Sequence, residues 1–81
     1  MWILNNMDKK IIEKIFISTI NLKKNIDITK LKYGDHNWDS IIHMQLISNL
    51  EKKFRVAIDT EDVIDMSSFN KALKILKKYK K

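Results

Sequence analysis

The sequence predicts a single all-α domain, a small four-helix bundle with three longer helices and a short third one. Its 81 residues and 9.7 kDa suffice for one hydrophobic core and not for two. The chain has no Pro and one Gly, whereas a β-sandwich or barrel needs several tight turns built from such residues. A hydrophobic content of 44% favours a packed chain over a disordered one. We expect residues 1–81 to form one domain, with residues 1–7 and 78–81 fraying at its ends.

The two longest predicted helices carry apolar residues at helical spacing. The first covers about residues 8–20, with Asn6 or Asp8 as its cap, and its apolar positions are Ile11, Ile12, Ile15, Phe16 and Ile20. The second begins after Asp39, a strong N-cap candidate, and its apolar stripe consists of Ile42, Leu46, Ile47, Leu50 and Phe54.

The remaining segments connect and close the bundle. Residues 21–38 form a long connection that we expect to be anchored by Ile26, Ile28 and Leu31. An extended connector at residues 56–58 leads to a short helix near residues 61–64, capped by Asp59 or Thr60. Ser67 or Ser68 caps a last helix whose inner face is Phe69, Ala72, Leu73, Leu76 and Tyr79. The predicted core comprises Ile12, Ile15, Phe16, Ile28, Leu46, Leu50, Phe54, Ile58, Val63, Leu73 and Leu76.

The net charge of +6 suggests an acidic or nucleic-acid partner, but its distribution weakens that interpretation. The middle of the chain, residues 39–66, is acidic, and the Lys-rich end at Lys77, Lys78, Lys80 and Lys81 is typical of a solvated terminus. Arg55 is the only Arg, and Arg is the usual residue for bidentate base recognition. We expect no nucleic-acid partner, and a small basic helical DNA-binding protein remains the alternative from another class.

The sequence lacks the residues that most kinds of enzymatic catalysis require. The absence of Cys excludes disulfides, thiolate-bound zinc and a cysteine nucleophile. His36 and His43 are the only histidines, and we interpret both as surface or loop residues rather than metal ligands. There is no Gly-rich phosphate loop, and no serine triad can be assigned in so small a bundle. We expect a non-enzyme, with no metal site and no membrane-inserted segment.

One dipeptide stands out at the start of the second helix. Asp39-Ser40 directly follows the long connection, so Ser40 occupies the first helical position. A phosphate on its hydroxyl would lie near unpaired backbone N–H groups and the positive end of the helix dipole. An ordinary helix start would also explain the dipeptide, so the remainder of the chain has to decide between the two interpretations.

From Trp38 to Leu76 the sequence resembles the acyl carrier protein and peptidyl carrier family. The family's Asp-Ser-Leu motif is matched by Asp39-Ser40-Ile41, and its Leu-Glu-x-x-Phe helix end by residues 50–54. Val56-Ala57-Ile58 corresponds to the connector, residues 61–64 to the short acidic third helix, and Ser67-Ser68-Phe69 to the capped last helix. The register runs through without an insertion.

The resemblance implies a function and its cofactor. Ser40 would be esterified by a 4′-phosphopantetheine arm from coenzyme A, and Asp39 would help to engage the phosphopantetheinyl transferase. The thiol of the arm would carry an acyl or aminoacyl group as a thioester, which a chain without Cys cannot do with its own side chains. We expect a monomeric cytoplasmic carrier that presents this group to acyl-loading and acyl-transfer enzymes through a surface formed by Ile41, Met44, Gln45, Glu61 and Asp62.

Three departures from the family pattern bear on the pathway. The outer face of the second helix is not strongly acidic, since we expect His43, Gln45, Ser48 and Asn49 there. Ile41 stands where the family usually has Leu, and Trp38 stands where it usually has a small residue. These differences favour a carrier for a dedicated biosynthetic pathway, with the general fatty-acid-synthesis carrier as the alternative within the family.

Overall fold

The computed structural model describes residues 6–79, and within that range the regular elements are all helical. They are α1 (Asn6–Ile20), α2 (Ser40–Phe54), α3 (Thr60–Asp65) and α4 (Phe69–Tyr79), with a short 3-10 turn, η1 (Ile28–Lys30), before α2. The predicted arrangement of three longer helices and a short third one is therefore confirmed. Of the termini expected to fray, 6–7 and 78–79 are helical, and the remaining residues lie outside the described range.

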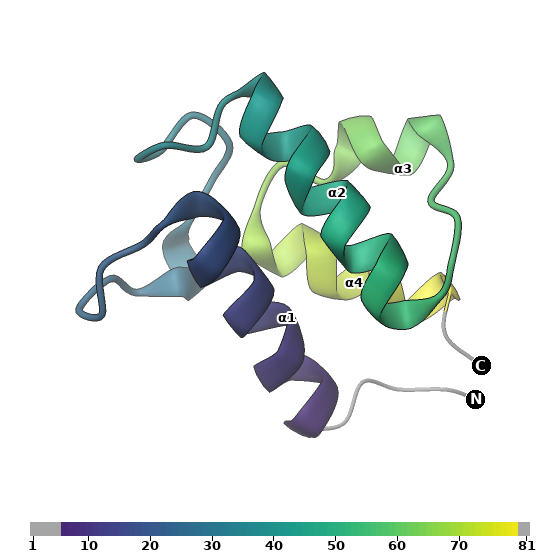
Figure 1. Cartoon of the computed structure of the whole chain (residues 1–81), viewed down its shortest axis with the longest axis horizontal. Helices are drawn as coiled ribbons and strands as arrows, with labels where there is room; N and C mark the ends of the chain where they lie inside the picture. The colour runs from purple at the N-terminus through teal and green to yellow at the C-terminus, as the bar shows by residue number, and fades with distance from the viewer. Residues whose placement is uncertain (1–5, 80–81) are drawn as a thin grey trace.

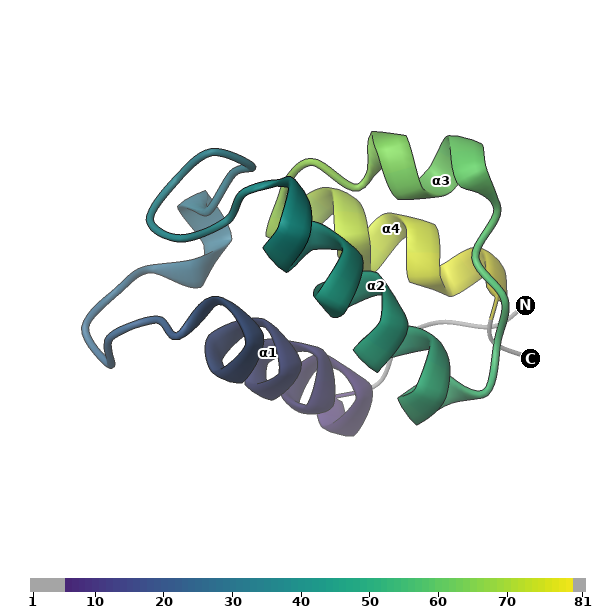
Figure 2. The ribbon, with the colours of Figure 1, turned by 45° about the horizontal axis from the view of Figure 1, so that its top comes forward.

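The helices form a compact bundle in which α1 and α2 pack side by side. Helix α3 lies beside α2 on the side away from α1, and α4 packs behind, in contact with α1 (Figures 1 and 2). The Cα radius of gyration is 11.7 Å, as expected for a compact chain of this length. None of the described helices is long and apolar enough to cross a membrane.

The long connection between α1 and α2 is hydrogen-bonded to the chain at the start of α4. Backbone N–H groups of Phe69 and Tyr33 donate to Leu31 O at 3.2 Å and to Ser67 O at 2.8 Å, respectively. Asp27 caps η1 by accepting from the backbone N–H and the hydroxyl of Thr29. These hydrogen bonds, the one from the Thr29 hydroxyl above all, lower the pKa of Asp27. Of the three predicted anchors, Leu31 is buried, whereas Ile26 and Ile28 are half-buried.

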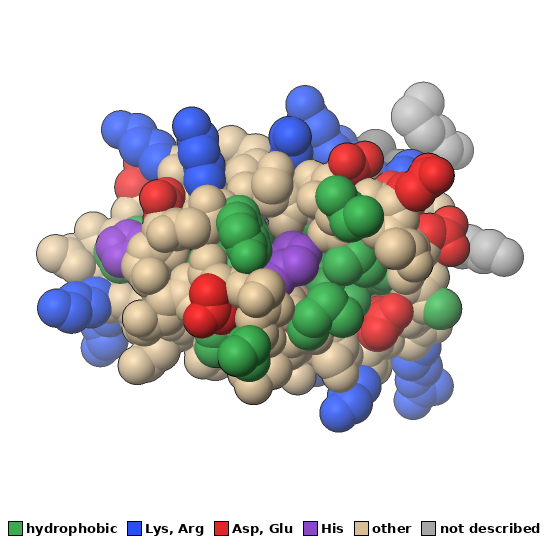
Figure 3. Space-filling model, turned by 90° about the horizontal axis from the view of Figure 1, so that it is seen from above, with side chains coloured by type: hydrophobic (Ala, Val, Ile, Leu, Met, Phe, Trp, Pro, Cys, Tyr) green, Lys and Arg blue, Asp and Glu red, His purple; other side chains and the backbone are tan. Residues whose placement is uncertain are grey.

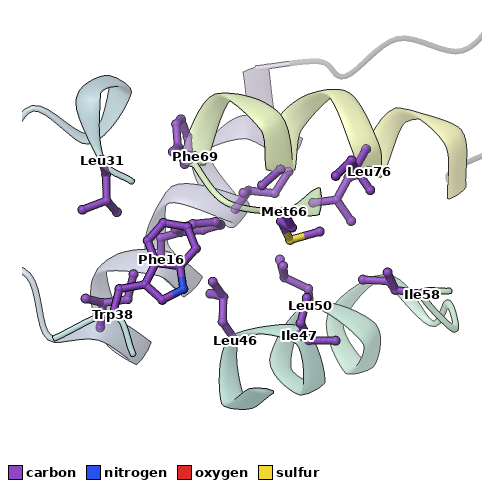
Figure 4. Close-up of a cluster of buried hydrophobic side chains, with 14 residues drawn as sticks. Phe16, Leu31, Trp38, Leu46, Ile47, Leu50, Ile58, Met66, Phe69 and Leu76 are labelled. Atoms are coloured by element: carbon purple, nitrogen blue, oxygen red, sulfur yellow. The ribbon is translucent and has the colours of Figure 1, made fainter. Parts of the chain in front are cut away.

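The core is built around aromatic side chains that come from three different segments. The Phe16 ring makes edge-to-face contacts with Trp38 and Phe69, with ring centroids 5.4 Å and 5.2 Å apart. Figure 4 shows Phe16 and Trp38 together at one end of the core and Met66 between α2 and α4. The buried apolar residues are Ile12, Phe16, Ile20, Leu31, Trp38, Leu46, Ile47, Leu50, Ile58, Met66, Phe69, Ala72, Ile75 and Leu76.

The predicted core is confirmed in part. Buried as expected are Ile12, Phe16, Leu46, Leu50, Ile58 and Leu76, whereas Ile15, Ile28, Phe54, Val63 and Leu73 are half-buried and pack against them. The core prediction left out Trp38 and Met66, which lie outside the long apolar stripes, and their burial depends on how the loops fold back. Both are 1% exposed or less.

The ends of the helices follow local chemistry. Helix α2 ends at Phe54, and its C-cap Arg55 adopts a left-handed conformation (φ 56°, ψ 49°) that turns the chain into the connector. Glu51 holds that connector by accepting from Ile58 N at 2.8 Å. Ser68 caps α4 by accepting from Lys71 N. Asp59 occupies the N-cap position of α3, but the expected capping hydrogen bond of its side chain is not formed.

Candidate functional site

The candidate site begins at the N-terminus of α2, where the predicted cap is confirmed. Asp39 has an extended backbone, and its side chain accepts from Ile42 N at 2.9 Å. The first helical hydrogen bond runs from His43 N to Asp39 O at 2.8 Å. Ser40 is the first residue of the helix and is exposed. Its hydroxyl therefore lies at the positive end of the helix dipole, next to backbone N–H groups that have no partner within the helix.

A mostly apolar pocket opens beside Ser40. It lies between α2, α3 and the loop before α2, has a volume of about 330 Å³, and is lined by Tyr33, Ser40, His43, Met44, Val63, Ile64, Met66 and Ser67. Figure 3, which views the molecule from above, shows hydrophobic side chains on both sides of a histidine on this face. The exposed serine and an apolar recess therefore lie together at one end of α2.

His43 forms the polar part of the pocket wall. Trp38 Nε1–H donates to His43 Nδ1 at 3.0 Å, so the ring proton is on Nε2, which donates to Val63 O at 2.7 Å. The ring stacks on Trp38 at 5.8 Å between centroids and meets Tyr33 edge-on. The expectation of a surface histidine on the outer face was wrong for His43, which is 9% exposed. Burial is possible because both ring nitrogens are paired.

Other polar residues of that face lie near the surface. His36, for which a surface or loop position was expected, is exposed in the loop. Gln45 and Asn49 are exposed, and Asn49 donates to the Thr19 hydroxyl at 3.0 Å; Ser48 is half-buried. No group of three or more His, Asp or Glu that could hold a metal ion is found within residues 6–79.

The five residues predicted to face partners occupy two different environments. Ile41 and Met44 are exposed, at 69% and 57%, and Gln45 and Glu61 are also exposed. Asp62 is instead turned towards α4 and only 13% of its side chain is exposed. Ile64 was not among the residues predicted for this surface, although it is 72% exposed and lines the same pocket as Met44. The apolar pair Val63-Ile64 in the short helix α3 was the sequence feature that could have indicated it.

Asp62 links α3 to the last turn of α4. Lys78 Nζ lies 2.7 Å from Asp62 Oδ1, and the Tyr79 hydroxyl donates to Asp62 Oδ2. The hydrogen bonds from Lys78 and, next, Tyr79 lower the pKa of Asp62, and the Asp62 carboxylate raises the pKa of Lys78. The pKa of Tyr79 is raised mainly by burial and also by its bond to Asp62. Lys78 is thus partnered, although 60% of its side chain is exposed.

No family model matches the chain, and no curated protein matches it. The family resemblance therefore depends on the residues between Trp38 and Leu76 and on the site just described.

Proposed function

We propose that this chain is a carrier protein of the acyl carrier type, with 4′-phosphopantetheine attached to Ser40. The observation that carries the proposal is an exposed serine hydroxyl at the first residue of an Asp-capped helix, at the mouth of an apolar pocket. The register of motifs from Trp38 to Leu76 and the bundle of three longer helices and one short helix support the same conclusion.

The residues around Ser40 suit a phosphodiester. The phosphate would lie at the start of α2, where unpaired N–H groups and the helix dipole favour negative charge. Ser40 is exposed, so a transferase can reach it, and the apolar lining of the pocket suits a group tethered nearby. When attached, the arm supplies a thiol that carries an acyl or aminoacyl group as a thioester.

The modification is a substitution at phosphorus in which Ser40 is the nucleophile. The Ser40 oxygen forms a bond to the phosphorus of coenzyme A that bears the pantetheine. The pyrophosphate bond to that phosphorus breaks, and adenosine 3′,5′-bisphosphate leaves. The hydroxyl proton passes to a base of the transferase. Asp39 lies next to the nucleophile, with one carboxylate oxygen engaged by Ile42 N, and its charge would help to hold the magnesium ion of the transferase.

The partner enzymes would contact the apolar surface around the pocket mouth. Ile41, Met44 and Ile64 are large exposed apolar residues on adjoining helices, and such a cluster is typical of a protein contact. The exposed residues of α2 beside the pocket, Ile41, Met44 and Gln45, carry no charge, so we propose a dedicated partner set rather than the enzymes of general fatty-acid synthesis. The carrier presents its group at high effective concentration and catalyses nothing itself.

Intact-mass spectrometry after incubation with coenzyme A, Mg²⁺ and a broad-range phosphopantetheinyl transferase tests the proposal. We expect one phosphopantetheine addition in the native chain and in the matched control Ser18→Ala, and none in Ser40→Ala. Ser18 is an exposed helical serine outside the site. Modification at another serine, or none in a folded chain, would overturn the carrier mechanism. Salt-sensitive retention on DNA would instead favour the DNA-binding alternative.

A further inference from the structure

The pocket beside Ser40 ends at an inner wall formed by His43 and Met66. Met66 is fully buried and His43 is 9% exposed, so both belong to the pocket lining and to the interior. Trp38 stacks behind His43, and Phe16 contacts Trp38 edge-on at 5.4 Å. A chain that extended past His43 would enter the core between the long helices.

His43 cannot swing aside without loss of two hydrogen bonds. Its Nδ1 accepts from Trp38 Nε1–H, and its Nε2–H donates to Val63 O, so the ring links the loop before α2 to α3. If the ring rotated away, the buried indole N–H and the part-buried carbonyl would both lose this hydrogen-bond partner, which is unfavourable. Met66 is apolar and flexible by comparison, which makes His43 the rigid part of the wall.

The size of the pocket limits what it can take up in front of this wall. An engineered cavity of about 150 Å³ holds one benzene molecule, and this pocket measures about 330 Å³. At the same volume per atom, the pocket has space for roughly a dozen non-hydrogen atoms. Once the atoms of the thioester itself are subtracted, roughly eight carbons of an acyl chain can be accommodated. Both nitrogens of His43 are already paired, so its ring has no free group with which to hold a polar cargo.

We propose that the hydrogen-bonded bridge Trp38–His43–Val63 keeps the carried group out of the core and thereby selects apolar acyl groups of short to medium length. This inference rests on the proposed function. His43 is a specificity-determining residue that sets the depth of the pocket.

The test uses the full chain loaded at Ser40 with butanoyl, octanoyl, dodecanoyl and hexadecanoyl pantetheine. The broad-range transferase and the matching acyl-coenzyme A thioesters supply these four forms. Intact mass confirms loading, and circular dichroism gives the thermal midpoint of each form. For the native chain we expect the midpoint to rise from butanoyl to octanoyl by roughly 10–25 °C, and then to stay level, because further carbons remain in water.

Two variants at one position separate the bridge from mere bulk. His43→Gln retains an acceptor for the indole and a donor for the carbonyl, so it should keep the plateau. His43→Leu removes both while it leaves a side chain of similar size, so dodecanoyl should raise its midpoint by roughly a further 10–25 °C. If His43→Leu fails to fold, Trp38→Phe removes the indole donor together with part of the ring volume behind His43 and should extend the rise in the same direction.

The outcomes are distinguishable from failure of the proposed function. A native midpoint that keeps rising through hexadecanoyl, or one that is the same at every length, overturns the depth limit although Ser40 is loaded. Equal profiles for the Gln and Leu variants overturn the role of the bridge. Absence of any mass increase overturns the carrier function itself, and with it this inference.

Discussion

Asp39 connects the stability of the bundle to the proposed chemistry, so its substitution tests both. Its side chain makes a single capping hydrogen bond, from Ile42 N to Oδ1 at 2.9 Å. Asp39→Ala removes that bond and the negative charge at the positive end of α2. Asp39→Asn removes the charge alone, because an amide oxygen can accept the same hydrogen bond.

The magnitude follows from the loss of one exposed N-cap. Replacement of such a cap by Ala costs about 0.5–2 kcal/mol of unfolding free energy. A domain of this size has a total stability of roughly 4–12 kcal/mol. The loss corresponds to a fall of roughly 3–15 °C in the thermal midpoint of Asp39→Ala. For Asp39→Asn we expect a much smaller change, since the capping oxygen is preserved.

Two measurements on the same samples separate the roles. Urea denaturation followed by circular dichroism gives the unfolding free energy, and timed intact-mass spectra give the rate of phosphopantetheine transfer. We expect Asp39→Asn to be close to native in stability and slow in modification, and Asp39→Ala to be impaired in both. An unchanged midpoint in Asp39→Ala would refute the capping argument. Modification of Asp39→Asn at the native rate would refute the need for the charge.

Two further predictions concern the bundle. Leu50 is fully buried, so Leu50→Ala should cost about 2–5 kcal/mol, whereas Met44→Ala, exposed on the same helix, should stay within about 0.5 kcal/mol; equal urea midpoints would contradict the assigned inner face of α2. Asp62→Asn should lower the thermal midpoint at pH 7, because the hydrogen bonds from Lys78 and Tyr79 lower the pKa of the native carboxyl. The stabilisation by the charged Asp62 carboxylate is fully present above the unfolded pKa of about 3.9, and it disappears as the pH falls through the lower folded pKa. In a pH series, the thermal midpoints of the native chain and the variant should therefore converge below that range. A difference in thermal midpoint between the native chain and Asp62→Asn that stays constant down to about pH 2 would contradict this explanation.

The sequence by itself determined the features that depend on neighbours along the chain. The N-cap at Asp39 depends on one side chain and an N–H three residues later, and the structure contains that bond. The apolar stripe of α2 predicts which face of the helix is buried, because a helix places residues three and four apart on one side. Leu46, Ile47 and Leu50 are buried accordingly. The candidate serine followed from the same local register.

Only the tertiary structure determined the surroundings of His43 and Asp62 at the candidate site. His43 looked like an outer-face residue, because the stripe of α2 shows the side that faces α1 and α4 but not the side that α3 covers. The return of the chain beside α2 places Val63 O within 2.7 Å of its ring, and the loop brings Trp38 Nε1 within 3.0 Å. Asp62 was expected to face partners, and it faces α4 because Lys78 and Tyr79 come within its reach. The contacts of His43 with Val63 and of Asp62 with Lys78 and Tyr79 join residues 16 to 20 positions apart in sequence. No local periodicity encodes them, and the pocket exists only once those segments have packed.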